Sequence, residues 1–369
     1  MPRNPQASIY GERAVLYNAR WLEAKARIGG RNRPHSGGYM GDLAGRHRLG
    51  RAALLSLLLL SAAQPAATTP PTDPAGLVLS DRFEQGGFAP EGGLFYKDNP
   101  EQRGGRVVFG AQSPLRGRGE LTLTTMPSCD PRARGCSERA EVWERPEVLV
   151  PYSQTVWYGF AMRLNDPLPQ DDRRYVMAQW KREILRDAQG DFSPFLALRL
   201  YRGHLGFTVE TDLIESYPIG GPQRPQGCLP GEARVLSRPQ VHQTRALVAI
   251  ESGSAPEEYP SYFGACAPGI RVTRHADLPA ARKGWIDFVV RSQPGPSGDG
   301  HIEILADGIR IVTVRGHIGH AAPGLDRNQY FKFGPYRAPN AKPWSISYDD
   351  FRRGPRCSDV IRAGQCPSE

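Results

Sequence analysis

The sequence predicts an all-β protein, built as a two-sheet sandwich of the jelly-roll kind, and three observations carry this prediction. The 369 residues include 41 glycines, 34 prolines and 33 aromatic side chains, a composition typical of turn-rich β-proteins. Short runs in which apolar and polar residues alternate recur along the chain and end in Gly, Pro, Asn or Asp. No long stretch of the sequence has the periodicity of an amphipathic helix.

Residues 1–77 are expected to precede the folded domain. Residues 1–39 show no apolar periodicity and are expected to be a disordered or misassigned extension. Residues 40–66 predict a signal peptide, because three arginines precede an apolar run of about a dozen residues that small residues follow. That run is shorter than the roughly 20 residues of a membrane span. Residues 67–77, rich in Thr and Pro, predict a linker to a domain over 78–369, and we expect a secreted or periplasmic protein.

Positive charge is concentrated in this leader. The whole chain carries a formal charge of +9, which taken alone suggests a polyanionic partner. Residues 1–66, however, hold ten basic and three acidic side chains, so the remaining 303 residues carry only +2. The body is nearly neutral and has no nucleic-acid-binding motif, which argues against a nucleic-acid partner. A polyanion would have to be recognised by a few positioned side chains.

Twelve strands are expected in the body of the chain. They are predicted over residues 106–109, 120–124, 139–142, 156–164, 175–180, 195–200, 205–210, 285–291, 301–305, 309–314, 330–333 and 345–351. Asp307 and Gly308, between two alternating runs, predict a hairpin turn. Residues 211–284 are rich in Pro and Gly, and we expect an irregular insertion with only a strand or two.

Six cysteines fit an exported protein. They are Cys129, Cys136, Cys228, Cys266, Cys357 and Cys366, and six cysteines allow 15 pairings, so the connectivity stays open. Pairing each cysteine with its nearest neighbour closes three loops without crossing, and the middle one would staple the insertion. No pair has zinc-finger spacing, so we expect disulfides and no metal ligands.

Three predicted strands place polar side chains in a row on one face. Period-two alternation gives these sets: Arg139, Glu141 and Trp143; Gln179 and Lys181; Lys332 and Tyr336. Such rows of charged, amide and aromatic groups are of the kind that lines a groove.

With these motifs the sequence resembles the jelly-roll polysaccharide lyases, the concanavalin A-like group that includes heparin lyase I, glucuronan lyase and the smaller alginate lyases. The resemblance spans about residues 79–354 and rests on the segments 139–141, 157–160, 179–180, 284–290, 332–337 and 348–351. It implies a secreted lyase that cleaves a uronic acid polymer by β-elimination. In that reaction a base removes the C5 proton after the neighbouring carboxylate has been neutralised, and the O4 leaving group departs.

The resemblance also implies roles for individual residues. Arg139 and Gln179 match the positions that neutralise the carboxylate, and Tyr336 matches the tyrosine that acts as acid, or as both acid and base. A phenol has a pKa of about 10, so we expect basic neighbours, Lys332 and Arg337, to favour its ionised form. Substrate contacts are expected from Lys181, Glu141, Arg337 and Trp180.

Lys181 departs from the family pattern. Several relatives carry a histidine at this position, which serves as base or carboxylate ligand. Lysine supplies charge but is a poor base unless it is strongly desolvated. Either Tyr336 performs both proton transfers, or another histidine replaces the missing one, or catalysis is lost. His204, just before a predicted strand, is the best substitute, whereas His320 is expected to be a surface residue.

Two other functions compete with the lyase. A glycoside hydrolase needs two carboxylates about 5–10 Å apart, but Glu141 faces away from Glu138 and Glu144, which are about 20 Å apart on a strand. A non-catalytic lectin-like module is the stronger rival, because the same fold and surface could bind a sugar chain without cleaving it. We expect a monomer that binds an acidic polysaccharide, either a uronan or a glycosaminoglycan, with an unsulfated uronan preferred. We expect no stable membrane insertion and no cofactor. A structural calcium ion stays open, although no loop has EF-hand spacing.

Overall fold

A computed structural model shows the fold of the body of the chain. It describes residues 73–98, 102–130, 132, 135–190, 192, 194–213, 228–240, 243–267 and 269–368. The predicted extension, signal peptide and most of the linker lie outside these residues. The described chain is all-β, as predicted, and its only helical elements are 3-10 turns, namely η2 (Pro74–Gly76), η3 (Pro90–Gly92), η4 (Pro146–Val148), η5 (Pro256–Glu258) and η6 (Cys357–Asp359). None of the described helices has the length and apolar character needed to cross a membrane.

The first sheet is antiparallel and has nine strands. Eight of them follow one another in the order β15 (Ile270–Arg274), β18 (Ile309–Ile318), β17 (Gly295–Ala306), β16 (Ile286–Ser292), β8 (Val156–Leu164), β20 (Trp344–Gly354), β4 (Glu120–Thr125) and β3 (Gly105–Gly110). The ninth strand, β1 (Leu79–Asp81), pairs with β20. Strands distant in the sequence are therefore neighbours, as in a jelly roll.

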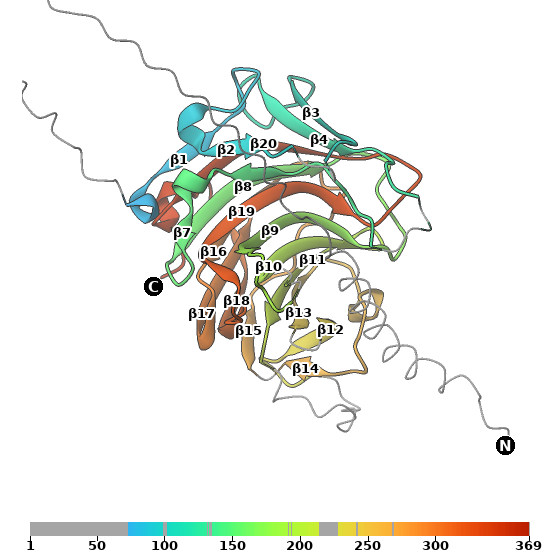
Figure 1. The fold of residues 1–369 in the computed structure, drawn as a ribbon, viewed down its shortest axis with the longest axis vertical. Coiled ribbons are helices and arrows are strands. Elements are labelled where there is room, and N and C mark those ends of the chain that lie inside the picture. The colour runs from blue at the N-terminus through green and yellow to red at the C-terminus, as the bar shows by residue number, and fades with distance from the viewer. Residues whose placement is uncertain are drawn as a thin grey trace, which may run out of the picture. The chain divides into compact units, whose positions relative to one another are not determined.

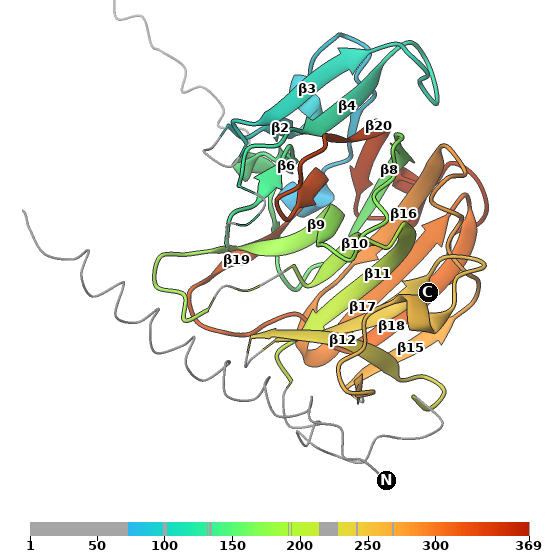
Figure 2. The same cartoon turned by 90° about the vertical axis from the view of Figure 1, so that its right-hand side faces the viewer.

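The second sheet is also antiparallel and has eleven strands. Its order is β14 (Cys266–Ala267), β12 (Ala233–Gln240), β13 (Gln243–Ile250), β11 (His204–Thr211), β10 (Leu196–Tyr201), β9 (Tyr175–Ile184), β19 (Leu325–Arg337), β6 (Val142–Glu144) and β2 (Leu94–Tyr96). Two short strands, β5 (Glu138–Arg139) and β7 (Val150–Pro151), also pair with β19. The two sheets form the layers of the sandwich (Figures 1 and 2).

Aromatic side chains from both sheets meet in the core between the layers. The ring centroids of Trp180 and Phe331, from the second sheet, are 4.6 Å apart, and Phe160 from β8 lies 5.3 Å from Phe331. Trp180 is fully buried in this cluster. The structure thus corrects the expectation that Trp180 contacts substrate, because its position on β9 alternates with Gln179 and points inward.

The predicted strands are confirmed, with one difference in the insertion. All twelve are present, and the run over 139–142 is divided between β5 and β6. Asp307 and Gly308 form the predicted turn, with positive φ angles of 52° and 77°. The described part of residues 211–284, however, contains four strands rather than one or two. Among them β12 and β13 have eight residues each and extend the second sheet. Their alternation was hidden by the Pro and Gly content of the connections around them.

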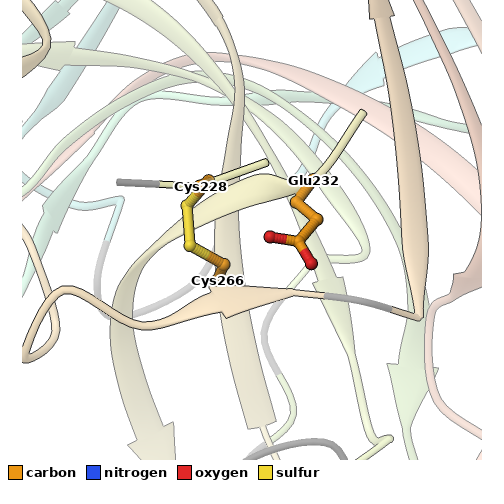
Figure 3. Close-up of side chains that lie close together, drawn as sticks. All are labelled: Cys228, Glu232 and Cys266. Atoms are coloured by element: carbon orange, nitrogen blue, oxygen red, sulfur yellow. A yellow bond between two sulfur atoms is a disulfide. The ribbon is translucent and has the colours of Figure 1, made fainter. Parts of the chain in front are cut away.

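The nearest-neighbour disulfides are all formed. They join Cys129 to Cys136, Cys228 to Cys266, and Cys357 to Cys366. Glu232 lies beside the second disulfide (Figure 3), and these three side chains are the one described group of His, Cys, Asp or Glu close enough to suggest a metal ion. Because both sulfur atoms are covalently bonded to each other, the group has no thiolate to offer and is not a metal centre.

Candidate functional site

Five residues of the predicted rows lie together on the outer face of the second sheet, the face turned away from the core. Lys332 on β19 pairs with Trp143 on β6 and with Gln179 on β9. Tyr336, farther along β19, pairs with Arg139 on β5. The alternation predicted for residues 139–143 is confirmed, since Arg139, Glu141 and Trp143 lie on the outer face while Ala140 and Val142 pack into the core. Two neighbouring cross-strand rows therefore hold most of the predicted chemistry.

Glu141 is the centre of this group. Gln179 Nε2 donates to Glu141 Oε1 at 2.5 Å, Lys332 Nζ donates to Glu141 Oε2 at 3.0 Å, and Arg139 Nη1 lies 3.5 Å from the same oxygen. The Glu141 side chain is fully buried, so it does not bind substrate directly, contrary to the prediction. It holds donors from three strands in one place, and we call Arg139, Gln179 and Lys332 with Glu141 the Glu141 cradle.

A glycine on β19 allows Glu141 to reach this position. Gly334 has a φ of 125°, which side chains rarely adopt, and a Cβ there would lie 2.1 Å from the carbonyl oxygen of Ala140. The Ala140 N–H donates to the Pro335 carbonyl at 2.9 Å. The backbone between β5 and β6 is thus held directly against β19, which puts Glu141 next to Lys332.

Cationic groups surround the ring of Tyr336, which is half-buried. The Arg139 Cζ lies 4.2 Å from the ring centroid, the Arg174 Cζ 4.6 Å and the Lys332 Nζ 5.9 Å. Arg139 comes from β5 and Arg174 directly precedes β9, the two strands that flank β19 here. Guanidinium groups at these distances attract the electron-rich face of the ring.

Arg174 was missed in the sequence because of a β-bulge. Counting back in twos from Gln179 places Arg174 on the inner face. The pairing of β9 with β10 shifts by one residue, however, so that Met177 and Ala178 both pack into the core. The bulge returns Arg174 to the outer face, where it contacts Tyr336.

Burial lowers the pKa of the Lys332 amine. The side chain is 2% exposed, and its Nζ lies 4.4 Å from the centroid of the Trp143 ring. Burial, with smaller contributions from the Lys181 and Arg139 charges, lowers the pKa of Lys332 to about 7, although Glu141 acts in the opposite direction. Lys332 therefore changes charge close to neutral pH. Lys181 lies beside this group, since it pairs with Tyr330 on β19.

A second buried cluster lies on the same face, across β10, β11 and β13. Glu210 on β11 accepts from Arg245 Nε at 2.7 Å, and Arg199 Nη2 lies 3.9 Å from the same carboxylate oxygen. Burial lowers the pKa of Arg199 to about 10. For Arg245, burial is outweighed by Glu210 and by the Tyr201 and Tyr336 hydroxyls, so its pKa is raised. The cluster is thus in electrostatic contact with Tyr336.

His320 joins this cluster, although the sequence predicted a surface residue. It is 3% exposed, and its Nε2 lies 3.8 Å from Glu210 Oε2. Burial lowers the pKa of His320, with Arg182 and Lys181 adding to the shift, whereas Glu210 and Asp212 oppose it. Nothing in its local sequence, on a turn after β18, distinguishes it from an exposed histidine.

Two predicted site residues lie elsewhere. His204 Nε2 is 3.2 Å from Glu258 Oε1, and the three strand steps from β11 to β19 put it about 14 Å or more from the Tyr336 backbone. It therefore does not replace the missing histidine. Arg337 faces the other side of β19, where its Nε donates to Glu138 Oε2 at 2.7 Å, and both side chains are 1% exposed. The prediction that Arg337 binds substrate or assists Tyr336 is wrong, because this buried pair occupies its guanidinium.

These positions define what the site can do. The Glu141 cradle gathers two basic side chains and an amide beside Tyr336, and Arg139 is its most exposed member at 13%, whereas Gln179 and Lys332 are 2% exposed. Carboxylates are bound best by charge-assisted donors of this kind. Tyr336 stands beside the cradle with a hydroxyl that can move a proton. The arrangement suits a reaction in which negative charge develops on a carboxylate-bearing carbon.

One family model matches the chain, and several solved structures are similar to it. A family model described as polysaccharide lyase matches residues 92–352. An endo-β-1,4-glucuronan lyase from the fungus Trichoderma reesei is similar in structure, with a TM-score of 0.48 and 14% identity over 77% of this chain and 97% of that one. The cellulose-induced protein Cip1 gives a TM-score of 0.41 and 13% identity over 75% and 97% of the two chains. Alginate lyase Aly36B gives a TM-score of 0.34 and 12% identity over 75% of this chain and 96% of that one. No match was found among curated proteins.

Proposed function

The chain belongs to the polysaccharide lyase family, and from this premise we propose that it cleaves a uronic-acid-containing polysaccharide by β-elimination. The observation that carries the proposal is the convergence of Arg139, Gln179 and Lys332 on Glu141 directly beside Tyr336. This convergence supports assigning the two components that the reaction needs, a site that neutralises a carboxylate and a group that transfers protons.

The Glu141 cradle neutralises the uronate carboxylate. In the ground state the carboxylate withdraws little electron density from C5, so the C5 proton is weakly acidic. When Arg139, Gln179 and Lys332 bind the carboxylate, the charge that moves onto it as the proton leaves is stabilised. Those bonds strengthen as the enolate-like charge develops, so the transition state is bound more tightly than the substrate.

Tyr336 transfers the protons. In its phenolate form, with the Arg139 and Arg174 guanidinium groups against its ring, Tyr336 accepts the C5 proton. The phenol so formed then donates that proton to the departing O4, and the C4–C5 double bond forms. Tyr336 thus serves as both base and acid, which fits the distance of His204 and the burial of His320.

We further propose that the enzyme acts outside the cytoplasm on an acidic polysaccharide. Three disulfides support an oxidising compartment. The predicted signal peptide at 40–66 would lead there. The cations on the outer face of the second sheet favour a polyanionic substrate in spite of the nearly neutral body.

The test is an assay of the purified protein with glucuronan, alginate, heparin and heparan sulfate, following the ultraviolet absorbance of the unsaturated uronate product. We expect absorbance to rise with at least one uronan and the rise to be lost in Tyr336→Phe. Tyr262→Phe, a half-buried tyrosine on the loop between β13 and β14, is the matched control and should keep wild-type activity. Binding of a uronan without any absorbance change would favour the lectin-like alternative.

A further inference from the structure

We propose that the outer face of the first sheet carries a second, non-catalytic site that binds an anionic polysaccharide, with Arg271 and Arg315 as its main contacts. We call these two residues the arginine pair. The site lies on the opposite side of the sandwich from the Glu141 cradle and holds another stretch of the polymer that the cradle binds. The inference takes the identity of the anion from the proposed function, and its test separates the two.

The arginine pair lies near one edge of the first sheet, on β15 and β18 (Figure 2). Arg271 is the direct cross-strand partner of Arg315. Their neighbours Ile270, Val272 and Val314 pack into the core, so alternation turns both arginines to the outer face, where both are exposed. Side chains paired in this way have Cβ atoms about 5 Å apart, and like charges there repel each other. An anion bound between the two guanidinium groups relieves this repulsion.

Glu303, on the neighbouring strand β17, does not compensate the arginine pair. His301 Nε2 and Arg310 Nη2 each lie 2.8 Å from its Oε1, while Arg310 Nε and the Thr313 hydroxyl donate to its Oε2 at 3.0 and 2.9 Å. Burial alone would raise the pKa of Glu303, but these hydrogen bonds and the Arg310 charge lower it to about 2. Within the described part of the chain, neither member of the arginine pair has an ion-pair partner. The charge of the pair is therefore open to a ligand.

Arg291 and Arg310 add positive charge beside the pair. Cross-strand pairing places Arg291 opposite Glu303, and Arg310 donates two hydrogen bonds to the same carboxylate. With the arginine pair they make four arginines against one glutamate, a formal charge of +3, whereas the 303 residues after the leader together carry +2. Positive charge is thus concentrated on this face, which favours a polyanion over a neutral polymer.

The position of the pair suits a long polymer. β15 is the edge strand of the first sheet, and Arg274 on it donates to the Val248 carbonyl on β13 at 3.3 Å, so the two sheets meet at this edge. From β13 to Tyr336 on β19 there are four strand steps, about 19 Å, to which the sheet spacing of about 10 Å adds. A polymer that reaches both sites must therefore cover about 30 Å or more, which a tetrasaccharide does not span. For a long chain, binding of the second segment is intramolecular and increases the overall affinity.

The experiment compares long polyglucuronate with a glucuronate tetrasaccharide for the wild type and two double variants, Arg271→Ala/Arg315→Ala and Arg103→Ala/Arg106→Ala. The second variant removes two exposed arginines, on and just before β3 at the other edge of the same sheet, and changes the net charge equally. We expect the arginine-pair variant alone to raise KM for the long polymer about fivefold, the effect of losing two exposed ion pairs, with kcat unchanged. KM for the tetrasaccharide should keep its wild-type value, and about 0.5 M salt should abolish the difference.

Failure of this inference is distinguishable from failure of the lyase. If the arginine-pair variant raises KM for both substrates, or for neither, the second site is overturned and the lyase stands. If no uronan is cleaved, the proposed function fails, and the site is then tested by calorimetric binding of the long polymer. About fivefold weaker binding by the arginine-pair variant alone would support the site, whereas equal affinity of the two double variants would overturn it. Weaker sedimentation of the arginine-pair variant with vesicles of anionic phospholipid, at unchanged affinity for the polymer, would assign this face to a membrane surface and also overturn the proposal.

Discussion

Lys332 and Glu141 form a buried ion pair at the centre of the site, with Nζ 3.0 Å from Oε2 and neither side chain more than 2% exposed. Taking two charges out of water is costly, and their attraction offsets that cost only while both are present. The pair is therefore sensitive to any change in either partner. It also links the stability of the fold to the charge that the site offers to substrate.

Glu141→Gln is expected to weaken both stability and activity. Removal of one partner from a buried pair costs about 3–5 kcal/mol, so the free energy of unfolding should fall by an amount of this order. Lys332 also loses the carboxylate that favours its charged form, so the amine should be largely neutral at pH 7 and bind the uronate poorly.

Urea unfolding and kinetics at several pH values check this prediction. Glu147→Gln, an exposed glutamate on η4, is the matched control and should behave as wild type. The activity of Glu141→Gln should partly recover at lower pH, where Lys332 regains its proton. An activity loss of the same size at pH 6 and pH 8 would contradict the role assigned to the Lys332 charge.

The stability of the protein should depend on pH through Lys332. Burial lowers its pKa to about 7 from the usual 10.5, so between these values the unfolded chain binds a proton that the folded chain does not. The free energy of unfolding contributed by this group therefore rises with pH across that window, and its cost is fully present below pH 7. Lys332→Met should remove this rise. Urea unfolding curves from pH 6 to 10 measure it, and parallel pH profiles for the two proteins would refute the prediction.

Period-two alternation was sufficient to predict the faces of regular strands. It placed Arg139, Glu141 and Trp143 on one face and correctly excluded Glu138 from it. It could not place Arg174, because a bulge of one residue inverts the pattern and leaves no mark in the composition. Nor could it show that the Glu141 carboxylate is buried and paired with Gln179, Lys332 and Arg139, since that depends on three strands meeting at one point.

Long-range pairing accounts for the other differences. Arg337 is buried because Glu138 lies opposite it on a strand almost 200 residues away, a contact that neither local sequence reveals. A turn at the end of β18 brings His320 next to Glu210 in the second buried cluster. The order of strands in the sheet separates His204 from Tyr336. Strand order in a jelly roll is set by crossovers, which a single sequence does not specify.

The disulfide across the insertion should contribute more stability than the one at residues 129–136. In the chain-entropy treatment, a disulfide restricts the unfolded chain more when it closes a longer loop. The sequence separations are 38 residues for Cys228–Cys266 and 7 for Cys129–Cys136. We expect a loss of about 4 kcal/mol for the double Cys→Ser variant of the former and about 2 kcal/mol for the latter. Equal losses in chemical unfolding would show that loop length does not govern the effect.

Trp180 and Trp143 should give opposite results on substitution, because they lie on opposite faces of the second sheet. Trp180 packs against Phe331 in the core and is fully buried, so Trp180→Ala should cost about 3–5 kcal/mol of stability. At a temperature where the variant is folded, its KM should be unchanged.

Trp143 stacks on Tyr330, with centroids 5.3 Å apart and planes at 13°, and its ring lies 4.4 Å from the Lys332 amine. Trp143→Ala removes a contact of the Lys332 amine, the group proposed to bind the uronate, so it should raise KM several-fold. The loss of stability should be smaller than for Trp180→Ala, because the Trp143 ring packs on the outer face instead of in the core. Thermal unfolding and steady-state kinetics on the same two variants measure both effects. If Trp180→Ala raised KM and Trp143→Ala left it unchanged, the result would contradict the assignment of the site to the outer face of the second sheet.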